Sequence, residues 1–396
     1  MRSKLFELIR TAAANMRSRP WLAATIPHGL EQLLRERLFT TEYILHLAHM
    51  TKAVKDSPPP ASDYSSTCRW RIGIVRDLFY NHESYIAACR ELNVPYKTVD
   101  LFASDWIQQV RSAKCDAFVV WPSECLSEWK RMYDERLKFI NQEMEILVYP
   151  PVDALWLYGS KQRMHSWLEI NEFPHAKTLV FYLKEEALTY LETAVYPLVL
   201  KLDIGAAANG VWIVKSKREA IKMVLQVFEK GLAGKRWDVR ARQWRYILMQ
   251  EFIPNLREWR LIRLGESYFG HEKGQLGDFH SGSGKVGWSA PPQTALDLLH
   301  NVTETGGFRS MAMDLFQTAD GRFLINELQS VFGSVDTAQM YIDGLPGRYR
   351  RINGEYIFEE GRFCRNACCN LRVEDLLYIL NSNPTKKVKV SYDHRN

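Results

Sequence analysis

The sequence lacks any apolar run approaching the ~20 residues that a membrane-spanning helix needs. It also lacks a strong excess of one charge, because 52 Lys and Arg residues stand against 46 Asp and Glu residues, a net charge of +6. That balance is weaker than a dedicated DNA-binding protein carries, so no nucleic-acid partner is expected. With 46% hydrophobic and 25% charged residues, the composition is that of a soluble globular protein and excludes a disordered or collagen-like chain.

Cysteine is scarce and odd in number, which argues against a disulfide framework. We therefore expect reduced thiols in a cytoplasmic protein. The last three cysteines form a cluster without a CxxC pair or a matching His cluster, so buried or surface thiols are favoured over a metal site. The seven are Cys68, Cys89, Cys115, Cys125, Cys364, Cys368 and Cys369.

A chain of 396 residues is too long for one hydrophobic core, since single cores stop growing near ~250 residues, so two or three packed units are expected. Residues 1–55 carry apolar positions at helical spacing, broken by Pro20 and Pro27, and predict a helical N-terminal extension. A helical arm docked on the main body is favoured; the alternative is that basic residues 1–20 associate with an anionic membrane surface. Pro- and Ser-rich residues 56–68 predict a linker.

Residues 69–152 alternate between strand and helix signals, which predicts a small doubly wound α/β domain. No GxGxxG turn follows its first strand, so a dinucleotide site is not supported there. The expected strands are 70–75, 96–101, 117–121 and 146–149, and the expected helices are 85–92 and 106–112.

A lysine ends the apolar strand Tyr196–Lys201, and the small-residue loop Gly205–Gly210 follows before a second strand, Val211–Val214. Backbone N–H groups of such a loop can approach phosphate oxygens, while the lysine adds a positive charge. The alternative is a hairpin turn with a surface lysine.

Two further strands follow at 246–253 and 257–265, and their alternation puts Glu258 and Arg260 on one face of the second strand. Farther along, Met313–Phe316 and 323–329 predict a hairpin.

This hairpin places Asp314 and Glu327 side by side, with Gln329 on the same face as Glu327. Two carboxylates and an amide oxygen are hard oxygen donors, the ligand set of Mg2+ shared with nucleotide phosphates.

The order of these motifs resembles the ATP-grasp superfamily, in particular carboxylate-amine ligases typified by D-alanine:D-alanine ligases and ribosomal-protein glutamate ligases. The resemblance covers residues 70–340 and is strongest over 158–335. It implies an α/β fold with α+β lobes, in which a pre-ATP-grasp α/β domain, 69–152, precedes a central lobe, 153–250, and a C-terminal lobe, 251–385.

The resemblance also implies a nucleotide site for ATP. Lys161 and Lys201 match the two phosphate-binding lysines, and Glu258 with Arg260 matches an acidic-x-Arg motif beyond the adenine-binding hinge. The loop that closes over the triphosphate matches Gly205, Ala206, Ala207, Asn209 and Gly210, and the hinge matches Gln250, Glu251, Phe252 and Ile253.

Asp314, Glu327 and Gln329 match the metal-binding D…ExN pattern, with thirteen residues separating the two acids as in D-alanine ligases. Mg2+ is the implied metal, and Mn2+ is an alternative. Gln329 replaces the usual Asn, and Ala312 stands where D-alanine ligases carry an Arg. These departures argue against D-alanine ligase activity and favour the glutamate-ligase-like branch.

The implied reaction is ATP-dependent formation of an amide or peptide bond through an acyl phosphate, which Arg260 would stabilise. We interpret residues 270–285 as a mobile loop over the acceptor, and His280, Lys285 and Arg309 as candidates for binding an anionic substrate. The expected partners are small-molecule or peptide carboxylates and amines, and a homodimer is compatible with this class.

Two other functions remain open at this stage. An ATP-grasp kinase would phosphorylate a hydroxyl or phosphate group and form no acyl phosphate. A non-catalytic nucleotide-binding scaffold is the second; the intact Asp314/Glu327 pair weighs against it, whereas Gln329 is a departure that leaves it open.

Overall fold

A computed structural model describes residues 61–123, 126–205, 209–234, 240–274, 286–333 and 338–382. The predicted extension 1–55 lies outside these residues, as do residues 56–60 of the predicted linker. The rest of that linker contains the short edge strand β1 (Asp63–Tyr64), where the Tyr64 ring stacks on the Tyr96 ring at 5.8 Å.

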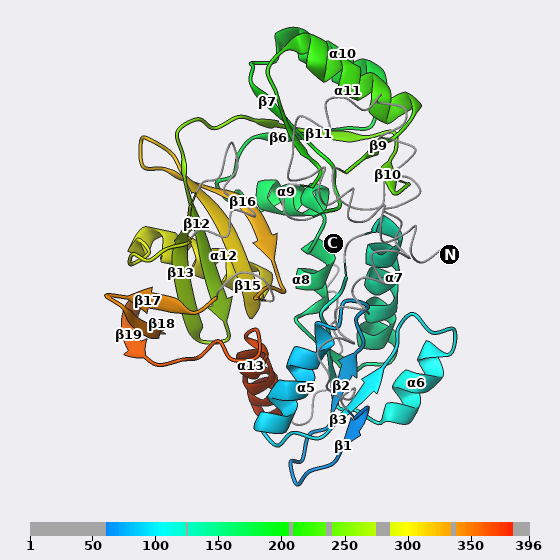
Figure 1. Cartoon of the computed structure of the whole chain (residues 1–396), viewed down its shortest axis with the longest axis vertical. Coiled ribbons are helices and arrows are strands. Elements are labelled where there is room, and N and C mark those ends of the chain that lie inside the picture. Colours follow the sequence, from blue (N-terminus) through cyan, green and yellow to red (C-terminus); the bar gives the residue numbers. More distant parts are fainter. Residues whose placement is uncertain are drawn as a thin grey trace, which may run out of the picture.

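The N-terminal unit is built on a sheet with the strand order β1-β3-β2-β4-β5. Its strands β1, β2 and β3 are labelled at the bottom of Figure 1. Strand β2 pairs in parallel with β3 and β4, and β4 pairs in parallel with β5, so the predicted doubly wound sheet is confirmed. The strands are β2 (Ile72–Val75), β3 (Tyr96–Val99), β4 (Ala117–Val119) and β5 (Leu147–Tyr149); the helices are α5 (His82–Glu91), α6 (Trp106–Ala113), α7 (Ser127–Lys138) and the π-helical turn Phe139–Glu143.

The two faces of this sheet bury different cores, as strand alternation requires. Ile72 and Ile74 pack on one side with Tyr85, whereas Val75 and Phe118 pack on the other. Gly73 lies opposite Phe118 in the parallel ladder, and a Cβ at Gly73 would come within 2.1 Å of the Phe118 ring. This close approach explains a glycine in the middle of a buried strand.

A central lobe follows, at the top of Figure 1, with the antiparallel sheet order β6-β11-β7-β8. Its core includes Leu198 and Leu200 of the sheet with Val224 and Val227 of the helix α11. The elements from the connection onward are α8 (Val152–Leu157), α9 (Lys161–Ile170), β6 (Thr178–Phe181), α10 (Lys184–Thr193), β7 (Leu198–Lys201), β8 (Val211–Val214), α11 (Lys217–Glu229), β9 (Leu232–Ala233), β10 (Arg242–Gln243) and β11 (Ile247–Glu251).

The C-terminal lobe is a larger antiparallel sheet with the main order β16-β15-β12-β13-β18-β17, and β14 and β19 pair with β13 and β18. Helix α12 packs on one face through Leu296 and Leu299, which share a core with Leu261 and Met313. The elements are β12 (Arg257–Leu264), β13 (Ser267–Lys273), β14 (Val286–Gly287), α12 (Gln293–Gly306), β15 (Ser310–Gln317), β16 (Phe323–Gln329), β17 (Met340–Ile342), β18 (Leu345–Ile352) and β19 (Glu355–Glu360).

Strand β13 corrects one interpretation of the sequence. Residues 270–273 were expected in a mobile loop because glycines lie on both sides, yet they form the second half of a strand that pairs with β12 along its whole length. Residues 275–285 of that expected loop lie outside the described residues.

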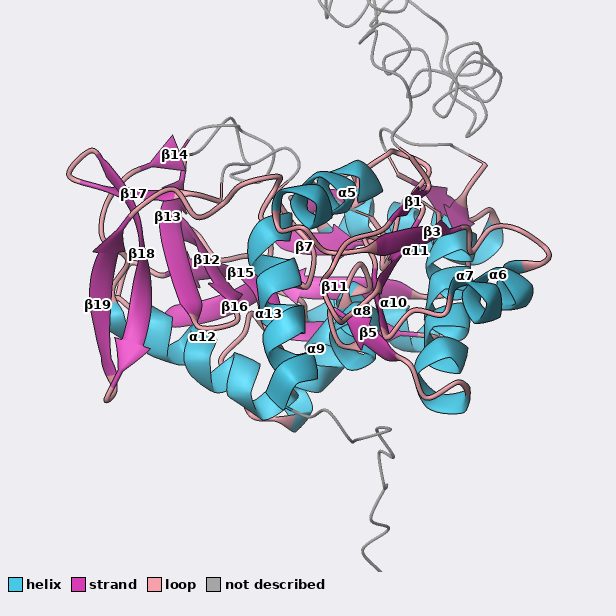
Figure 2. Cartoon of the chain, turned by 90° about the horizontal axis from the view of Figure 1, so that it is seen from below, coloured by secondary structure: helices cyan, strands magenta, loops and turns pink. Residues whose placement is uncertain are grey.

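The final helix, α13 (Cys369–Ser382), lies beside α5 between the N-terminal unit and the C-terminal lobe (Figures 1 and 2). Its Val373 and Leu376 belong to the core of the N-terminal sheet, whereas Leu371 packs with Cys368 against the C-terminal lobe. Residues 251–385 were assigned from the sequence to the C-terminal lobe, and within that range α13 also contacts the N-terminal unit, so it joins two units.

The α/β fold class predicted from the sequence is confirmed by these sheets and helices. The described cysteines form no disulfide among themselves. None of the helices in the described ranges is long and apolar enough to cross a membrane.

Candidate active site

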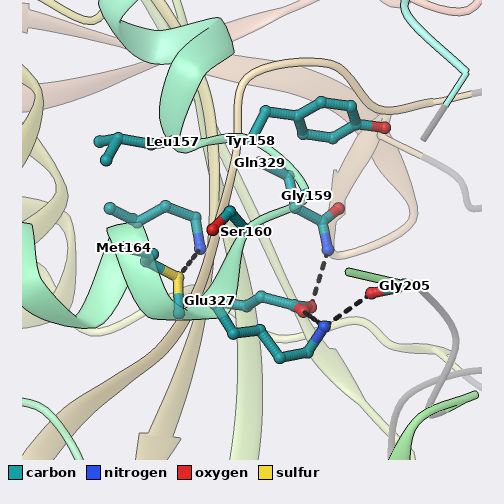
Figure 3. Close-up of a pocket in the computed structure, with 10 residues that line it drawn as sticks. Leu157, Tyr158, Gly159, Ser160, Met164, Gly205, Glu327 and Gln329 are labelled. Carbon is teal, nitrogen blue, oxygen red and sulfur yellow. Dashed lines mark hydrogen bonds and ion pairs between the residues drawn. The ribbon is translucent and has the colours of Figure 1, made fainter. Parts of the chain in front are cut away.

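Lys161 begins helix α9, directly after Ser160, whose Oγ accepts the N–H of Arg163 at 3.3 Å and caps the helix. The Lys161 ammonium donates to the carbonyl oxygens of Gly205 at 2.6 Å and Asp203 at 3.4 Å. It also lies 3.8 Å from the Glu327 carboxylate. Figure 3 shows Glu327 and Gly205 facing the same pocket from opposite sides. Lys161 therefore links the central lobe to the hairpin of the C-terminal lobe.

Lys201 ends β7 and is buried, with its Nζ 3.2 Å from Asn326 Oδ1. Burial lowers the pKa of Lys201 to about 8; the Glu327 charge opposes this shift and the Lys161 charge adds to it. The alternative of a hairpin with a surface lysine is wrong for the lysine, which is buried, although β7 and β8 do pair as an antiparallel hairpin. Asn326 was not predicted, because it owes its position to a β-bulge between β15 and β16.

The pocket between these groups is lined by Tyr158, Gly159 and Ser160 before α9, by Gly205, and by Glu327 and Gln329 of β16 (Figure 3). Of the predicted phosphate loop, Asn209 is buried and the Gly210 carbonyl accepts the N–H of Leu202 at 2.8 Å. Ala206 and Ala207 lie outside the described residues.

The predicted hinge begins with Gln250, which is buried and donates through Nε2 to Thr178 Oγ1 at 2.9 Å. The same amide lies 3.3 Å from Nε2 of His165, a residue that was not predicted. Burial, reinforced by the Lys201 charge, lowers the pKa of His165 to about 2, so the ring is neutral at physiological pH. Its position one helical turn after Lys161 is the signal that could have identified it.

The rest of the hinge passes from the central lobe to the C-terminal lobe. Glu251 ends β11, and its carboxylate accepts the backbone N–H of Lys177 at 2.7 Å. Phe252 and Ile253 follow at half-buried positions before β12. The segment connects β11 of the central lobe to β12 of the C-terminal lobe.

Glu258 and Arg260 share one face of β12, as predicted, and join a buried network with Asp314 and Lys273. Arg260 donates to both oxygens of Asp314, through Nε at 2.8 Å and Nη2 at 3.0 Å. Lys273 donates to Glu258 at 2.5 Å and to Asp314 at 3.0 Å. Lys273 was missed because its strand resembled a loop.

These contacts set the charge of Asp314. Burial by itself would raise the pKa of the Asp314 carboxyl, but the charges and hydrogen bonds of Arg260 and Lys273 outweigh it and hold the pKa well below its usual range. Burial by itself would lower the pKa of Lys273, but the charges of Asp314 and Glu258 outweigh it, so the pKa of Lys273 is raised. Asp314 and Lys273 are therefore both charged at neutral pH.

Asp314 and Glu327 lie directly opposite one another in the β15–β16 ladder, as the hairpin pattern predicted. The Glu327 side chain is 24% exposed to the pocket, and Gln329 Nε2 donates to it at 3.0 Å. Glu327 and the Gln329 amide oxygen thus fit an Mg2+ ion. Asp314 would join them only after exchanging a contact to Arg260 or Lys273. In the described part of the chain, no three His, Cys, Asp or Glu side chains converge as a metal site.

The structure does not bring Arg309, a predicted substrate-binding residue, to this pocket. Its guanidinium pairs with Asp375 of α13, with Nη2 2.5 Å and Nε 2.9 Å from the carboxylate. This ion pair holds α13 against the C-terminal lobe. His280 and Lys285, the other predicted substrate-binding residues, lie outside the described residues.

No protein-family model matches the chain. A curated human relative, the trifunctional purine biosynthetic protein adenosine-3, is 26% identical over 165 residues, which are 39% of this chain and 16% of that protein. The chain thus spans about a sixth of the length of this relative.

The solved structures that resemble this chain include two ATP-grasp proteins. The RimK domain ATP-grasp protein of Sphaerobacter thermophilus is 17% identical, with a TM-score of 0.45, over 65% of this chain and 90% of that one. Carboxyaminoimidazole ribonucleotide synthase of Aspergillus clavatus, complexed with ATP, is 14% identical, with a TM-score of 0.49, over 76% of each chain. The chain is similar to ATP-grasp proteins.

Proposed function

We propose that this protein is an ATP- and Mg2+-dependent ligase that joins a carboxylate to an amine through an acyl phosphate and releases ADP. One observation carries the proposal. Two buried lysines from different elements, Lys161 of α9 and Lys201 of β7, meet the hairpin that pairs Asp314 with Glu327. Buried cations beside paired carboxylates suit a polyphosphate with its metal ion.

The charge balance supports the need for a metal. Lys161, Lys201, Arg260 and Lys273 exceed the three carboxylates of Glu258, Asp314 and Glu327 by only one positive charge. An ATP molecule with about four negative charges would remain poorly neutralised by these residues alone. Mg2+ would be held by Glu327 and Gln329, with Asp314 as a third ligand after the exchange described above, and would supply the missing positive charge.

The protein groups would act mainly by position. Lys161 and Lys201 would hold the phosphates, and the backbone of residues 250–253 would bind the adenine. Asp314 fixes the Arg260 guanidinium through two hydrogen bonds, so this cation would be oriented before the substrate arrives.

The reaction has two steps. A substrate carboxylate oxygen attacks the γ-phosphorus, which gives an acyl phosphate and ADP; Arg260 would stabilise the charge on that intermediate. The amine nitrogen then attacks the acyl carbon, phosphate leaves, and the nitrogen releases a proton as the amide forms. The substrates would be small molecules or peptides.

Calorimetric titration with a non-hydrolysable ATP analogue, with and without Mg2+, tests the nucleotide site. Mg2+-dependent binding that Lys201→Ala weakens is the expected result. A lack of binding under every condition would reject the proposal and leave only a scaffold that binds no nucleotide.

Hydroxylamine trapping then tests the reaction type, because only an activated acyl group gives a hydroxamate. ADP release with a phosphorylated product and without a hydroxamate, across a panel of carboxylates, would identify a kinase instead.

A further inference from the structure

Three aromatic side chains form a cluster beside the buried network of the C-terminal lobe. His271 of β13 lies 5.7 Å from the Trp288 ring, and Trp288 lies 4.9 Å from the ring of Tyr341 on β17, both in edge-on contacts. We call these three residues the aromatic shelf. His271 is buried, Tyr341 is half-buried, and Trp288 is 42% exposed.

The shelf adjoins the proposed reaction centre through the strand register. His271 lies directly opposite Arg260 in the β12–β13 ladder, and Arg260 lies opposite Asp314 on its other side. Trp288 follows β14, in which Val286 pairs with Lys273. The two cations of the network therefore lie next to the shelf: Arg260 is directly opposite His271, and Lys273 is directly opposite Val286.

Because Trp288 is partly exposed, we interpret it as part of a binding surface rather than as a residue that only fills the hydrophobic core. Phe269 and Met340, on the same strands as His271 and Tyr341, are fully buried and already close the hydrophobic core there. A tryptophan needed only for packing would be buried with them. Instead a large aromatic surface faces outward, held by two ring contacts on a rigid sheet.

We propose that the aromatic shelf binds a planar, aromatic group of the carboxylate substrate, whose carboxylate end then faces Arg260. An aromatic ring gains from stacking on Trp288, and an anion gains from the adjacent cations, so both ends of one molecule would be recognised. The inference rests on the proposed ligase function, because that function puts the carboxylate beside Arg260. It names the substrate class, an aromatic carboxylate.

The test measures binding of two probes to the full chain by calorimetry: indole-3-propionate, which has a planar ring, and hexanoate, which is aliphatic. Each is titrated with and without Mg2+ and the non-hydrolysable ATP analogue. We expect wild type to prefer indole-3-propionate, and Trp288→Ala to weaken that probe by about three- to tenfold. Trp288→Phe, which keeps a ring, should retain most of the affinity.

Trp244→Ala is the matched control, since Trp244 is also a half-exposed tryptophan, at 50%, but follows β10 away from the shelf. It should bind both probes as wild type does. Three results would overturn the proposal that the shelf binds an aromatic carboxylate. They are equal binding of indole-3-propionate to Trp288→Ala and wild type, equal affinities of wild type for the two probes, and no binding of either probe. Failure of the nucleotide analogue alone to bind would reject the ligase proposal separately.

Discussion

At the scale of single residues, the candidate site is distinguished by two buried ammonium groups, of which Lys161 lines the pocket and Lys201 lies beside β16. Lys201 is 7% exposed, and its nearest described polar contact is a neutral amide oxygen, that of Asn326. The low dielectric of its surroundings penalises the charge, which is why its pKa falls to about 8. An incoming phosphate would supply the missing counter-charge.

Nucleotide affinity should therefore depend on pH. Below about pH 8 Lys201 is protonated and attracts phosphate. Above about pH 8 Lys201 of the free protein is deprotonated, so phosphate binding requires the uptake of a proton. The affinity for the ATP analogue with Mg2+ should fall by up to about tenfold per pH unit above pH 8. Titrations from pH 7 to 10 would check this, with Lys201→Arg, which keeps its charge, as the control. A flat wild-type profile would contradict the assignment.

Glu327 is the carboxylate of the pair that is open to the pocket, so its loss should be the more severe for metal binding. Glu327→Ala should abolish Mg2+-dependent binding of the analogue and lower ADP release by about 100-fold or more, since a metal contributes several kcal/mol to such a reaction. Glu355→Ala, on the exposed start of β19, is the control. ADP release near the wild-type rate in Glu327→Ala would mean that the metal lies elsewhere.

At the scale of helices and strands, local pattern explains what the sequence could predict. The N-terminal strands and the β15–β16 hairpin were located to within about three residues, because their apolar alternation and turn residues are local signals. Lys273 and Asn326 could not be predicted in the same way. The first lies in a strand defined by its pairing with β12, and the second is turned by a bulge that depends on the register with β15.

Helix α13 provides a test at this scale, because Arg309 contacts two carboxylates of unequal burial. Asp375 is buried and binds the guanidinium through both oxygens, whereas Glu266 is exposed and 3.4 Å away. Asp375→Ala should lower the free energy of unfolding by about 1–3 kcal/mol, since it removes charge-assisted hydrogen bonds and the contact to Tyr149.

Glu266→Ala should change the free energy of unfolding by no more than about 0.5 kcal/mol, because exposed ion pairs contribute little. The midpoint of urea denaturation measures both variants. Equal effects of the two substitutions would show that α13 is not held by the buried pair.

At the scale of the whole molecule, the three units are connected unequally. The N-terminal unit and the C-terminal lobe share α13, whose fully buried Arg372 donates to the Phe332 carbonyl at 2.9 Å and lies over the Trp121 ring at 5.1 Å. The central lobe meets β16 at the bridge His175–Ile325 and through the Lys161–Glu327 ion pair, and Met164 and Leu168 of α9 lie in the core of the C-terminal lobe. A ligand in the pocket would thus bind where elements of the two lobes meet.

Nucleotide binding should consequently stabilise the junction more than the rest of the chain. At 100 times its Kd, the analogue with Mg2+ should add about 2.7 kcal/mol to the stability of the folded state. Hydrogen exchange should slow most in β7, α9 and β16, which carry Lys201, Lys161 and Glu327. Slowing of hydrogen exchange confined to the N-terminal sheet would contradict this prediction, because it would place the nucleotide in the N-terminal unit. Lys201→Ala at the same analogue concentration should show little slowing, because the phosphate contact that joins β7 to β16 would be gone.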